Sequence, residues 1–216
     1  MTITLIHPSR SRAQKAKDNY HHWMSKASGK IQIQHVLSLD FNDPLINDYI
    51  ALQASAGMIV NENTCVVDAT NKGAKVATGD ILIYLSDDFK CPDNWDELIV
   101  KVFGDKLLTE PALVKVDDCL QGFDVAVLTI PIMNRKLYEK LGYFWHPGYK
   151  SMFVDEDLYW TTKNNNWMIL APELKFPHEH PCVGKAEDDE TYRRSAANWD
   201  QGKALYAQRS AEGFPI

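Results

Sequence analysis

The stretch "DILIYLSDDF", from Asp80 to Phe89, constrains the fold of this chain more than any other. Five of the six residues after Asp80 are Ile, Leu or Tyr, and Asp87 and Asp88 follow side by side. A continuous apolar run of this kind indicates a strand that is buried on both faces, inside a sheet. The two adjacent carboxylates at its end repel each other, so either solvent or a cation has to offset that repulsion.

Strand-like and helix-like segments alternate around this run. Strands are expected at 2–8 and 31–40, helices at 11–29 and 94–104, and a short helix or loop at 43–55. Residues 57–79 combine a short strand, a polar loop and a helix. The second half is less regular, with one or two strands in 112–133, a helix at 134–141, a strand after Trp167 and a helix in 188–213. Strands separated by helices indicate an α/β sheet that is at least partly parallel.

Polar residues follow three of these strands where each one ends. They are the segment Pro8–Arg12, Asp40, and the segment Ser86–Asp88. The carboxyl ends of parallel strands meet at one edge of a sheet, and ligands of open α/β sheets bind there. The sequence therefore predicts a ligand site at this edge.

Composition narrows the class of protein. A chain of 216 residues that is 45% hydrophobic has enough apolar material for one sizeable core, and its length predicts one domain or at most two small ones. The net charge of −6 argues against a globally basic surface for nucleic acid. Four cysteines without a CxxC pair indicate reduced thiols, and no apolar run approaches the roughly 20 residues of a membrane span. We therefore expect a soluble, cytoplasmic protein.

Three short segments combine residues that bind metal ions: "SDD" (86–88), "DED" (155–157) and "HEH" (178–180). Carboxylate oxygens together with an imidazole suit Mn²⁺ or Mg²⁺. Each segment also has an alternative reading that needs no metal. "SDD" could be a turn that caps a helix, "DED" an exposed helix start, and "HEH" a loop with one hydrogen-bonded histidine. The spacing between the segments leaves these alternatives open.

Taken together, the quoted segments resemble the nucleotide-sugar glycosyltransferases of the GT-A fold, close to family 2. The closest similarity is in "DATNKGAKVATGDILIYLSDD", where an Asn and a Gly precede a turn, an apolar strand and an acidic motif. The resemblance implies an α/β fold, the Rossmann-like three-layer α/β/α sandwich with a mixed, mostly parallel central sheet. It also implies one domain over 1–216, with a nucleotide-binding half (1–100), an acceptor and metal-completing half (101–190) and a C-terminal helix (191–216).

The resemblance assigns roles to individual residues. In the acidic motif Asp88 is the first choice as metal ligand, with His178 or His180 completing the shell around Mn²⁺ or Mg²⁺. "FVDEDLYW" is similar to the acceptor-side motif, with Asp157, preceded by Glu156, as the preferred catalytic base and Asp155 as the fallback. The residues implied to bind the nucleotide sugar are Pro8, Ser9, Arg10, Arg12, Asp40, Asn71, Lys72, Ser86 and Asp87.

The resemblance implies a metal-dependent transfer of a sugar to a hydroxyl acceptor with inversion, and it favours a UDP-linked hexose as the donor. The sequence does not name the acceptor, so glycan, protein, lipid-linked sugar and nucleobase stay open. Ser86 departs from the usual acid at its position, which encourages a second reading as a catalytically weak nucleotide-sugar-binding protein. A sugar-1-phosphate nucleotidyltransferase is a third reading, but "HPSRSR" lacks the glycine-rich loop of that class.

Four aromatic residues in "GYFWHPGY" have two interpretations. They are Tyr143, Phe144, Trp145 and Tyr149, and they either form a stacking wall for a sugar acceptor or pack as core beneath the "DED" segment.

Overall fold

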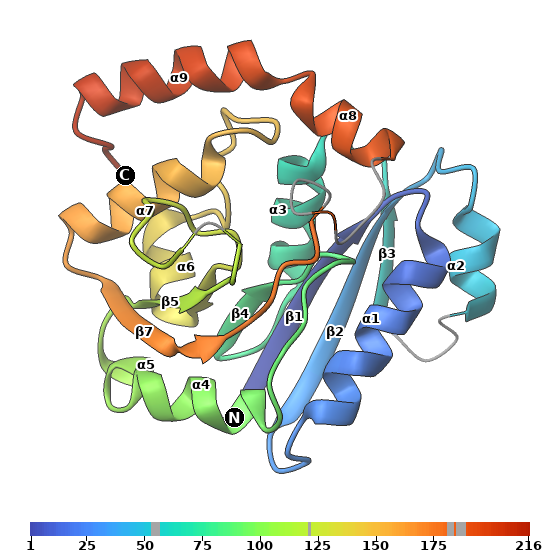
Figure 1. The fold of residues 1–216 in the computed structure, drawn as a ribbon, viewed down its shortest axis with the longest axis horizontal. Helices are drawn as coiled ribbons and strands as arrows, with labels where there is room; N and C mark the ends of the chain where they lie inside the picture. The colour runs from blue at the N-terminus through green and yellow to red at the C-terminus, as the bar shows by residue number, and fades with distance from the viewer. Residues whose placement is uncertain (53–56, 121, 181–183, 185–188) are drawn as a thin grey trace.

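The apolar run after Asp80 forms β4 (Ile81–Tyr84), the fourth strand in a seven-stranded sheet (Figure 1). We describe a computed structural model, which covers residues 1–52, 57–120, 122–180, 184 and 189–216. The strand order is β3-β2-β1-β4-β6-β5-β7. Strand β6 runs antiparallel to β4 and β5, whereas the other neighbouring strands are parallel. The expected mixed, mostly parallel sheet is confirmed.

The other strands are β1 (Thr2–Ser9), β2 (Gln32–Asp40), β3 (Gly57–Asn61), β5 (Leu113–Asp117), β6 (Ile132–Asn134) and β7 (Met168–Lys175). The helices of the first half are α1 (Ala13–Lys26), α2 (Ile46–Leu52), α3 (Val66–Val76), α4 (Trp95–Phe103) and α5 (Lys106–Thr109). Those of the second half are α6 (Arg135–Leu141), α7 (Val154–Asn164), α8 (Glu190–Ala196) and α9 (Trp199–Ala211).

The two faces of β4 belong to two different apolar cores. Ile81 and Ile83 pack with Trp23 of α1 and Trp95 of α4 on one face. Leu82 points to the opposite face, in a core that α3, α6 and α7 also enter. Successive side chains of a strand alternate between faces, so a strand covered on both sides needs an apolar residue at every position. The chain is therefore a three-layer α/β/α sandwich, as expected.

Two glycines allow α3 and its following turn to approach β1 closely. A Cβ atom on Gly73 would lie 2.8 Å from Ile6 Cγ2, and one on Gly79 would lie 2.7 Å from the Thr4 backbone nitrogen. Contacts of that length are shorter than van der Waals separation, so both positions need glycine to keep the helix against the sheet.

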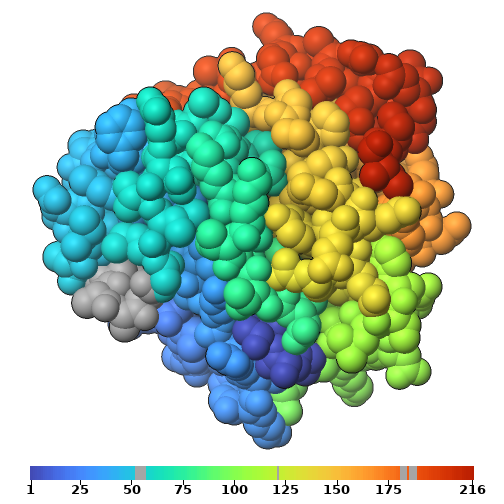
Figure 2. All heavy atoms as spheres, turned by 180° about the vertical axis from the view of Figure 1, so that it is seen from behind, coloured from blue at the N-terminus to red at the C-terminus, as the bar shows by residue number. Residues whose placement is uncertain are grey.

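Helix α3 is also joined to the segment that follows α6. Asn71 Nδ2 donates to the carbonyl of Trp145 at 2.8 Å, and Asn71 Oδ1 accepts from the amides of Phe144 and Trp145 at 2.9 Å each. In the space-filling view from behind, the two regions form one continuous surface (Figure 2). These bonds bring the second half of the chain against the first half beside the edge where β4 ends.

The C-terminal region differs from the sequence prediction, because two helices replace the single expected one. Helix α8 ends at Ala196 and α9 begins at Trp199. Asn198 stands at the junction and donates from Nδ2 to the Arg194 carbonyl, a side-chain bond that offers this carbonyl a partner outside a helical ladder. Cys182 and the end of the helix expected at 43–55 lie outside the described residues. No helix in the described ranges is long and apolar enough to cross a membrane.

Candidate functional site

A cavity of about 350 Å³ lies at the edge of the sheet where β1, β2 and β4 end. The predicted site residues that line it are Pro8, Ser9, Arg10, Arg12, Asp40, Ser86, Asp87, Asp88, Asp155, His178 and His180. Lining residues from the second half, such as Trp145 and Tyr192, close it from the opposite side. The fold thus gathers into one cavity three acidic or histidine-containing segments that are far apart in sequence.

Asp87 is held by donors that come from β1. Its Oδ1 lies 2.8 Å from His7 Nε2, and its Oδ2 accepts from Ser9 Oγ at 2.9 Å. The Tyr49 hydroxyl lies 2.7 Å behind Ser9 Oγ, and Arg12 Nη1 lies 4.0 Å from Oδ2. The Asp87 side chain is buried, so these fixed donors determine the orientation of its carboxylate.

Behind Asp87, two histidines form a buried chain of hydrogen bonds. His7 Nδ1 lies 3.0 Å from His35 Nε2, and the Tyr20 ring stacks on His35 with 4.2 Å between centroids. Burial and the neighbouring His7 lower the pKa of His35 well below its ordinary value, so His35 is neutral at pH 7. The fewest hydrogen-bonding atoms are left without a partner when His35 Nε2 donates to His7 Nδ1 and His7 Nε2 donates to Asp87 Oδ1. Only the acceptor His35 Nδ1 then lacks a partner among the described residues.

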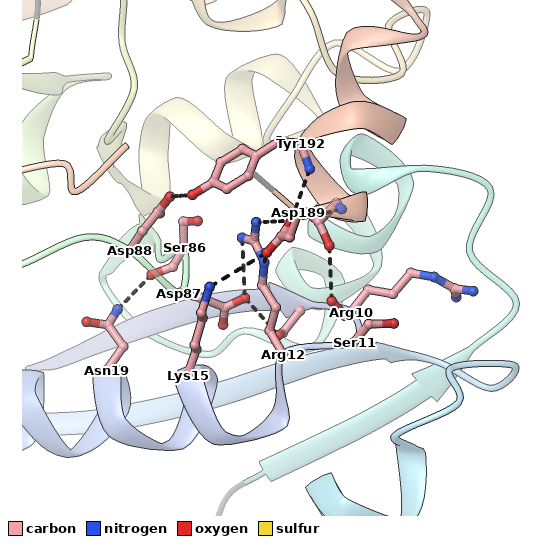
Figure 3. A network of polar contacts seen from close by, with 12 residues as sticks. Arg10, Ser11, Arg12, Lys15, Asn19, Ser86, Asp87, Asp88, Asp189 and Tyr192 are labelled. Atoms are coloured by element: carbon pink, nitrogen blue, oxygen red, sulfur yellow. Dashed lines mark hydrogen bonds and ion pairs between the residues drawn. The ribbon is translucent and has the colours of Figure 1, made fainter. Parts of the chain in front are cut away.

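The two carboxylate oxygens of Asp88 differ in their hydrogen bonding within the described residues. The Tyr192 hydroxyl donates to Oδ2 at 2.6 Å (Figure 3). His178 Nε2 lies 3.2 Å from the same atom. Burial alone would raise the pKa of Asp88, but the hydrogen bonds from His178 and Tyr192 outweigh it and hold that pKa below its ordinary value. Oδ1 is buried without a hydrogen-bond partner in the described part of the chain, which is costly for a carboxylate.

These atoms fit a divalent cation. An ionised carboxylate with a buried, unpartnered oxygen beside an imidazole is a borderline oxygen and nitrogen donor set, suited to Mn²⁺. The described residues contain no cluster of three or more His, Cys, Asp or Glu side chains around one point. Asp88 and His178 therefore supply at most a partial shell, which leaves positions for oxygen atoms of a ligand or water.

The segment after β7 places both histidines beside Asp88. The amide of Glu179 donates to the Asp88 carbonyl at 2.9 Å, and the Lys90 amide donates to the Pro177 carbonyl at 2.8 Å. The ring of His180 packs against His178 at 5.0 Å and against Tyr192 at 4.9 Å between centroids. The His178 imidazole contacts the Asp88 carboxylate through Nε2, 3.2 Å from Oδ2.

Asp189, which caps the start of α8, binds Arg12 beside the cavity. The Arg12 guanidinium donates from Nε and Nη2 to Asp189 at 2.8 and 2.7 Å, and it lies 4.3 Å from the centre of the Tyr192 ring. In Figure 3 Arg12 stands between Asp87 and Asp189, with Tyr192 reaching over it to Asp88. The bidentate pair fixes α8 against the segment that follows β1, and through Tyr192 it also fixes the Asp88 carboxylate.

Arg10 and Asp40 lie on the β2 side of the cavity. Arg10 Nη1 donates to Asp40 Oδ2 at 2.5 Å and to Asn42 Oδ1 at 2.8 Å. The other Asp40 oxygen accepts from Asn63 Nδ2 at 2.8 Å. A paired guanidinium and carboxylate, flanked by amides, present donors and acceptors that suit the edge of a base or a ribose hydroxyl.

The three acids of "DED" have different environments. Asp155 lines the cavity, and burial raises its pKa, with the nearby charge of Asp118 acting in the same direction. Glu156 does not line the cavity, and burial followed by the charge of Asp155 raises its pKa to about 7. Asp157 is 2% exposed and its carboxylate accepts from Arg209 Nε at 2.5 Å and from the Tyr149 hydroxyl at 2.9 Å.

Asp157, the first choice as base in the sequence prediction, therefore points into the protein and is neutralised by Arg209. Helical spacing explains the difference, because Asp155 and Asp157 lie two positions apart at the start of α7 and so face different directions. The geometry assigns the cavity position to Asp155, which the sequence prediction gave as the fallback to Asp157.

Two residues predicted to bind the nucleotide lie outside the lining of the cavity. Asn71 joins α3 to the segment after α6, as described above. Lys72 Nζ donates to the Glu62 carbonyl at 2.6 Å and to Asp68 Oδ2 at 2.9 Å. Both residues organise the loop and helix beside the cavity.

The aromatic segment after α6 is mainly core. Phe144, Trp145 and Tyr149 are 0%, 4% and 1% exposed and belong to the core on the α3 side of the sheet. Trp145 differs from Phe144 and Tyr149 because it also lines the cavity.

Several residues at the site have no signal in the sequence analysis. His7 and His35 stand in strands whose alternation predicts which face they occupy, yet nothing in the sequence pairs them with Asp87. Asp189 and Tyr192 lie in the tail, 177 and 104 residues after their partners Arg12 and Asp88. Contacts over that separation depend on the tertiary fold.

A scan of protein-family models and a search of curated proteins both found no match to this chain. Solved structures do match. TarS from S. aureus aligns with a TM-score of 0.63 at 12% identity, over 82% of this chain and 36% of that one. The mannosyltransferase PcManGT from Pyrobaculum calidifontis, in complex with GDP-Man and Mn²⁺, aligns with a TM-score of 0.67 at 16% identity, over 95% and 64%. Glucosyl-3-phosphoglycerate synthase from Mycobacterium tuberculosis aligns with a TM-score of 0.58 at 13% identity, over 92% and 77%.

The chain has the GT-A fold. It spans less than two thirds of the length of the TarS and mannosyltransferase chains. Identities this low establish the shared GT-A fold alone, so the chemistry of this chain has to be argued from its own cavity.

Proposed function

We propose that this protein is a metal-dependent glycosyltransferase that moves a sugar from a nucleoside diphosphate sugar, with UDP as the favoured nucleotide, to a hydroxyl acceptor. The observation that carries the proposal is the buried Oδ1 of Asp88, which lies after the end of β4, near His178, and has no hydrogen-bond partner among the described residues. It stands in one cavity with a fixed carboxylate, Asp87, and with a carboxyl of raised pKa, Asp155.

On the donor side, the end of β1 and the end of β2 would bind the nucleoside. Asp40, paired with Arg10, would face the base or ribose, and Asp87 would accept hydrogen bonds from ribose hydroxyls on the side that His7 and Ser9 leave free. Ser86 and Pro8 complete this wall. Because His7, Ser9 and Tyr49 hold Asp87 from behind, its carboxylate is oriented before the donor binds.

Asp88 and His178 would hold the divalent cation, with His180 beside them. A bound Mn²⁺ or Mg²⁺ would supply Lewis-acid stabilisation of the negative charge that develops on the departing diphosphate. Arg12 adds a permanent positive charge 4.0 Å from Asp87, although Asp189 neutralises much of it.

On the acceptor side, we propose Asp155 as the general base. Single-displacement transfer with inversion needs one base that removes the proton of the attacking hydroxyl as the bond to the anomeric carbon forms. Burial raises the pKa of Asp155, which strengthens it as a base. Asp157 is unsuited because Arg209 and Tyr149 occupy its oxygens.

Structures with the same fold support the donor class. TarS has been solved with UDP and with UDP-GlcNAc, PcManGT with GDP-Man and Mn²⁺, and the mycobacterial synthase with UDP and Mn²⁺. They favour a nucleoside diphosphate sugar with a divalent cation, and they leave the base and the sugar of this chain's donor to experiment.

The proposal is tested by a thermal-shift screen of UDP- and GDP-linked sugars with and without Mn²⁺. A ligand that binds the folded state alone raises the melting temperature as its concentration increases. We expect stabilisation by one donor in the presence of Mn²⁺, absent in Asp88→Ala. Mn²⁺-dependent binding without any release of UDP would favour the catalytically weak binding protein. Release of diphosphate from a nucleoside triphosphate and a sugar 1-phosphate would favour the nucleotidyltransferase.

A further inference from the structure

The mouth of the cavity carries two cations, Lys150 and Arg194, that have no counterion among the described residues. We propose that the acceptor bears an anionic group, a phosphate or a carboxylate, which Lys150 and Arg194 bind while its hydroxyl faces Asp155. This inference rests on the proposed glycosyltransferase function and names its acceptor class.

The charges around the cavity separate into paired and unpaired ones. Arg10 is paired with Asp40, and Arg12 is paired with Asp189. Lys150 and Arg194 also line the cavity, but neither side chain forms an ion pair or hydrogen bond within the described ranges. In a chain with a net charge of −6, two uncompensated cations at the opening of an acid-lined cavity form a local attraction for anions.

The two cations come from segments that hydrogen bonds join. Ser151 Oγ donates to the Ser195 carbonyl at 2.8 Å, which places the residues after Lys150 and Arg194 in direct contact. Gln201 Nε2 of α9 donates to the Gly148 carbonyl at 2.8 Å and supports the same junction. In Figure 1 the loop before α7 and helix α8 lie side by side above the sheet. Lys150 and Arg194 therefore stand on adjoining segments of the cavity wall.

The same junction belongs to the acceptor side of the cavity. Lys150 precedes Asp155 by five residues in the loop that leads into α7, whereas the proposed donor contacts come from the ends of β1, β2 and β4. An acceptor whose anion rests on Lys150 would have its hydroxyl directed inward, toward Asp155.

The side chains at the mouth of the cavity suit phosphate best among common anions. Arg194 offers a planar fork of N–H donors that matches two phosphate oxygens, and Lys150 adds a mobile point charge. The side chains of Ser195 and Asn198, which also line the cavity, add neutral polar groups. Both cations are solvent-exposed, so their attraction should weaken as salt increases.

The test uses the full chain saturated with UDP and Mg²⁺, so that the donor site is filled. Titration with inorganic phosphate, followed by backbone amide NMR shifts, should give saturable shifts around 150 and 194 with Kd of about 10 mM or tighter. The double variant Lys150→Gln with Arg194→Gln should lose this binding. The matched control Lys203→Gln, an exposed lysine of α9 outside the cavity lining, should keep it. Acetate in place of phosphate distinguishes a carboxylate from a phosphate site.

The second readout is UDP release with phosphorylated sugars and their unphosphorylated counterparts as acceptors. We expect the phosphorylated acceptor to have about tenfold higher kcat/KM, and the double variant to lose that preference without changed affinity for UDP. No phosphate binding by a UDP-loaded protein would overturn the acceptor inference and leave the proposed function standing. Weakened UDP binding in the double variant, with unchanged phosphate binding, would also overturn it by assigning both cations to the donor. Failure of UDP to bind at all would remove both proposals together.

Discussion

Replacing Asp157 by Asn separates the structural carboxylate of α7 from the proposed catalytic one. Asp157 and Arg209 form a pair whose side chains are 2% and 7% exposed, joined by contacts of 2.5 and 3.2 Å. The amide of Asn leaves the Arg209 guanidinium buried without a negative partner. Removing one member of a buried pair costs about 3–5 kcal/mol because the remaining charge stays in a poor solvent.

That loss translates into a large change in melting temperature. For a chain of this length each 1 kcal/mol changes Tm by about 2–4 °C, so Asp157→Asn should lower Tm by about 6–20 °C. Urea unfolding gives the free energy directly. Adding Arg209→Met to Asp157→Asn removes the stranded charge, and the double variant should regain a large part of the loss.

The matched variant is Asp155→Asn. Burial raises the pKa of Asp155, so ionisation of this group is disfavoured in the folded state, and a neutral amide should leave Tm unchanged or raise it. Its rate of UDP release should fall about 10²–10⁴-fold if Asp155 is the base. The assignment is refuted if Asp157→Asn keeps its Tm and loses activity while Asp155→Asn stays active.

Three further predictions concern residues around the cavity. His7→Leu removes the hydrogen bond to Asp87 Oδ1 and should weaken UDP binding, measured by calorimetry, about tenfold. His7→Gln keeps a hydrogen-bond donor and should retain most of the affinity for UDP. Equal affinity in both variants would contradict a positioning role for His7. Asn71→Ala removes three hydrogen bonds and should lower the free energy of unfolding by about 3 kcal/mol without weakening UDP binding, and weakened binding in a stable variant would return Asn71 to the donor site. Glu156 has a pKa of about 7 in the folded protein against 4.5 for an unperturbed Glu, so it binds a proton in the folded state that the unfolded chain has released. Its contribution to stability is therefore complete below that ordinary value and is lost as pH rises through about 7; Glu156→Gln should flatten the fall of Tm with pH, and an unchanged slope would exclude Glu156 as its source.

The fold could be predicted largely from the sequence because the deciding signals are local. The apolar run at 81–85 requires burial on both faces, and the glycines at 73 and 79 mark close approaches to β1. The position of the cavity could also be predicted from the strand ends, because Asp40 and Ser86–Asp88 lie at or just after the ends of parallel strands and line the same cavity.

The details of the site depend on tertiary contacts that the sequence does not reveal. The order Asp155, Glu156, Asp157 is visible in the sequence, but the face that meets the cavity is decided by Arg209, 52 residues later. Asn71 matches a family motif, yet its amide is used entirely by Phe144 and Trp145. Tyr192 reaches Asp88 over a separation of 104 residues, so no local pattern predicts that contact.

The central claim is that Asp88 and a divalent cation act on a nucleoside diphosphate sugar. Its most direct measurement is the initial rate of UDP release from UDP-hexoses, with Mn²⁺ and after chelation, in the unchanged protein and in Asp88→Asn. We expect UDP release that requires Mn²⁺, disappears on chelation and returns when the metal is added again. The Asp88→Asn variant should stay folded and release no UDP. Release that is equally fast without metal, or unchanged in Asp88→Asn, would contradict the account.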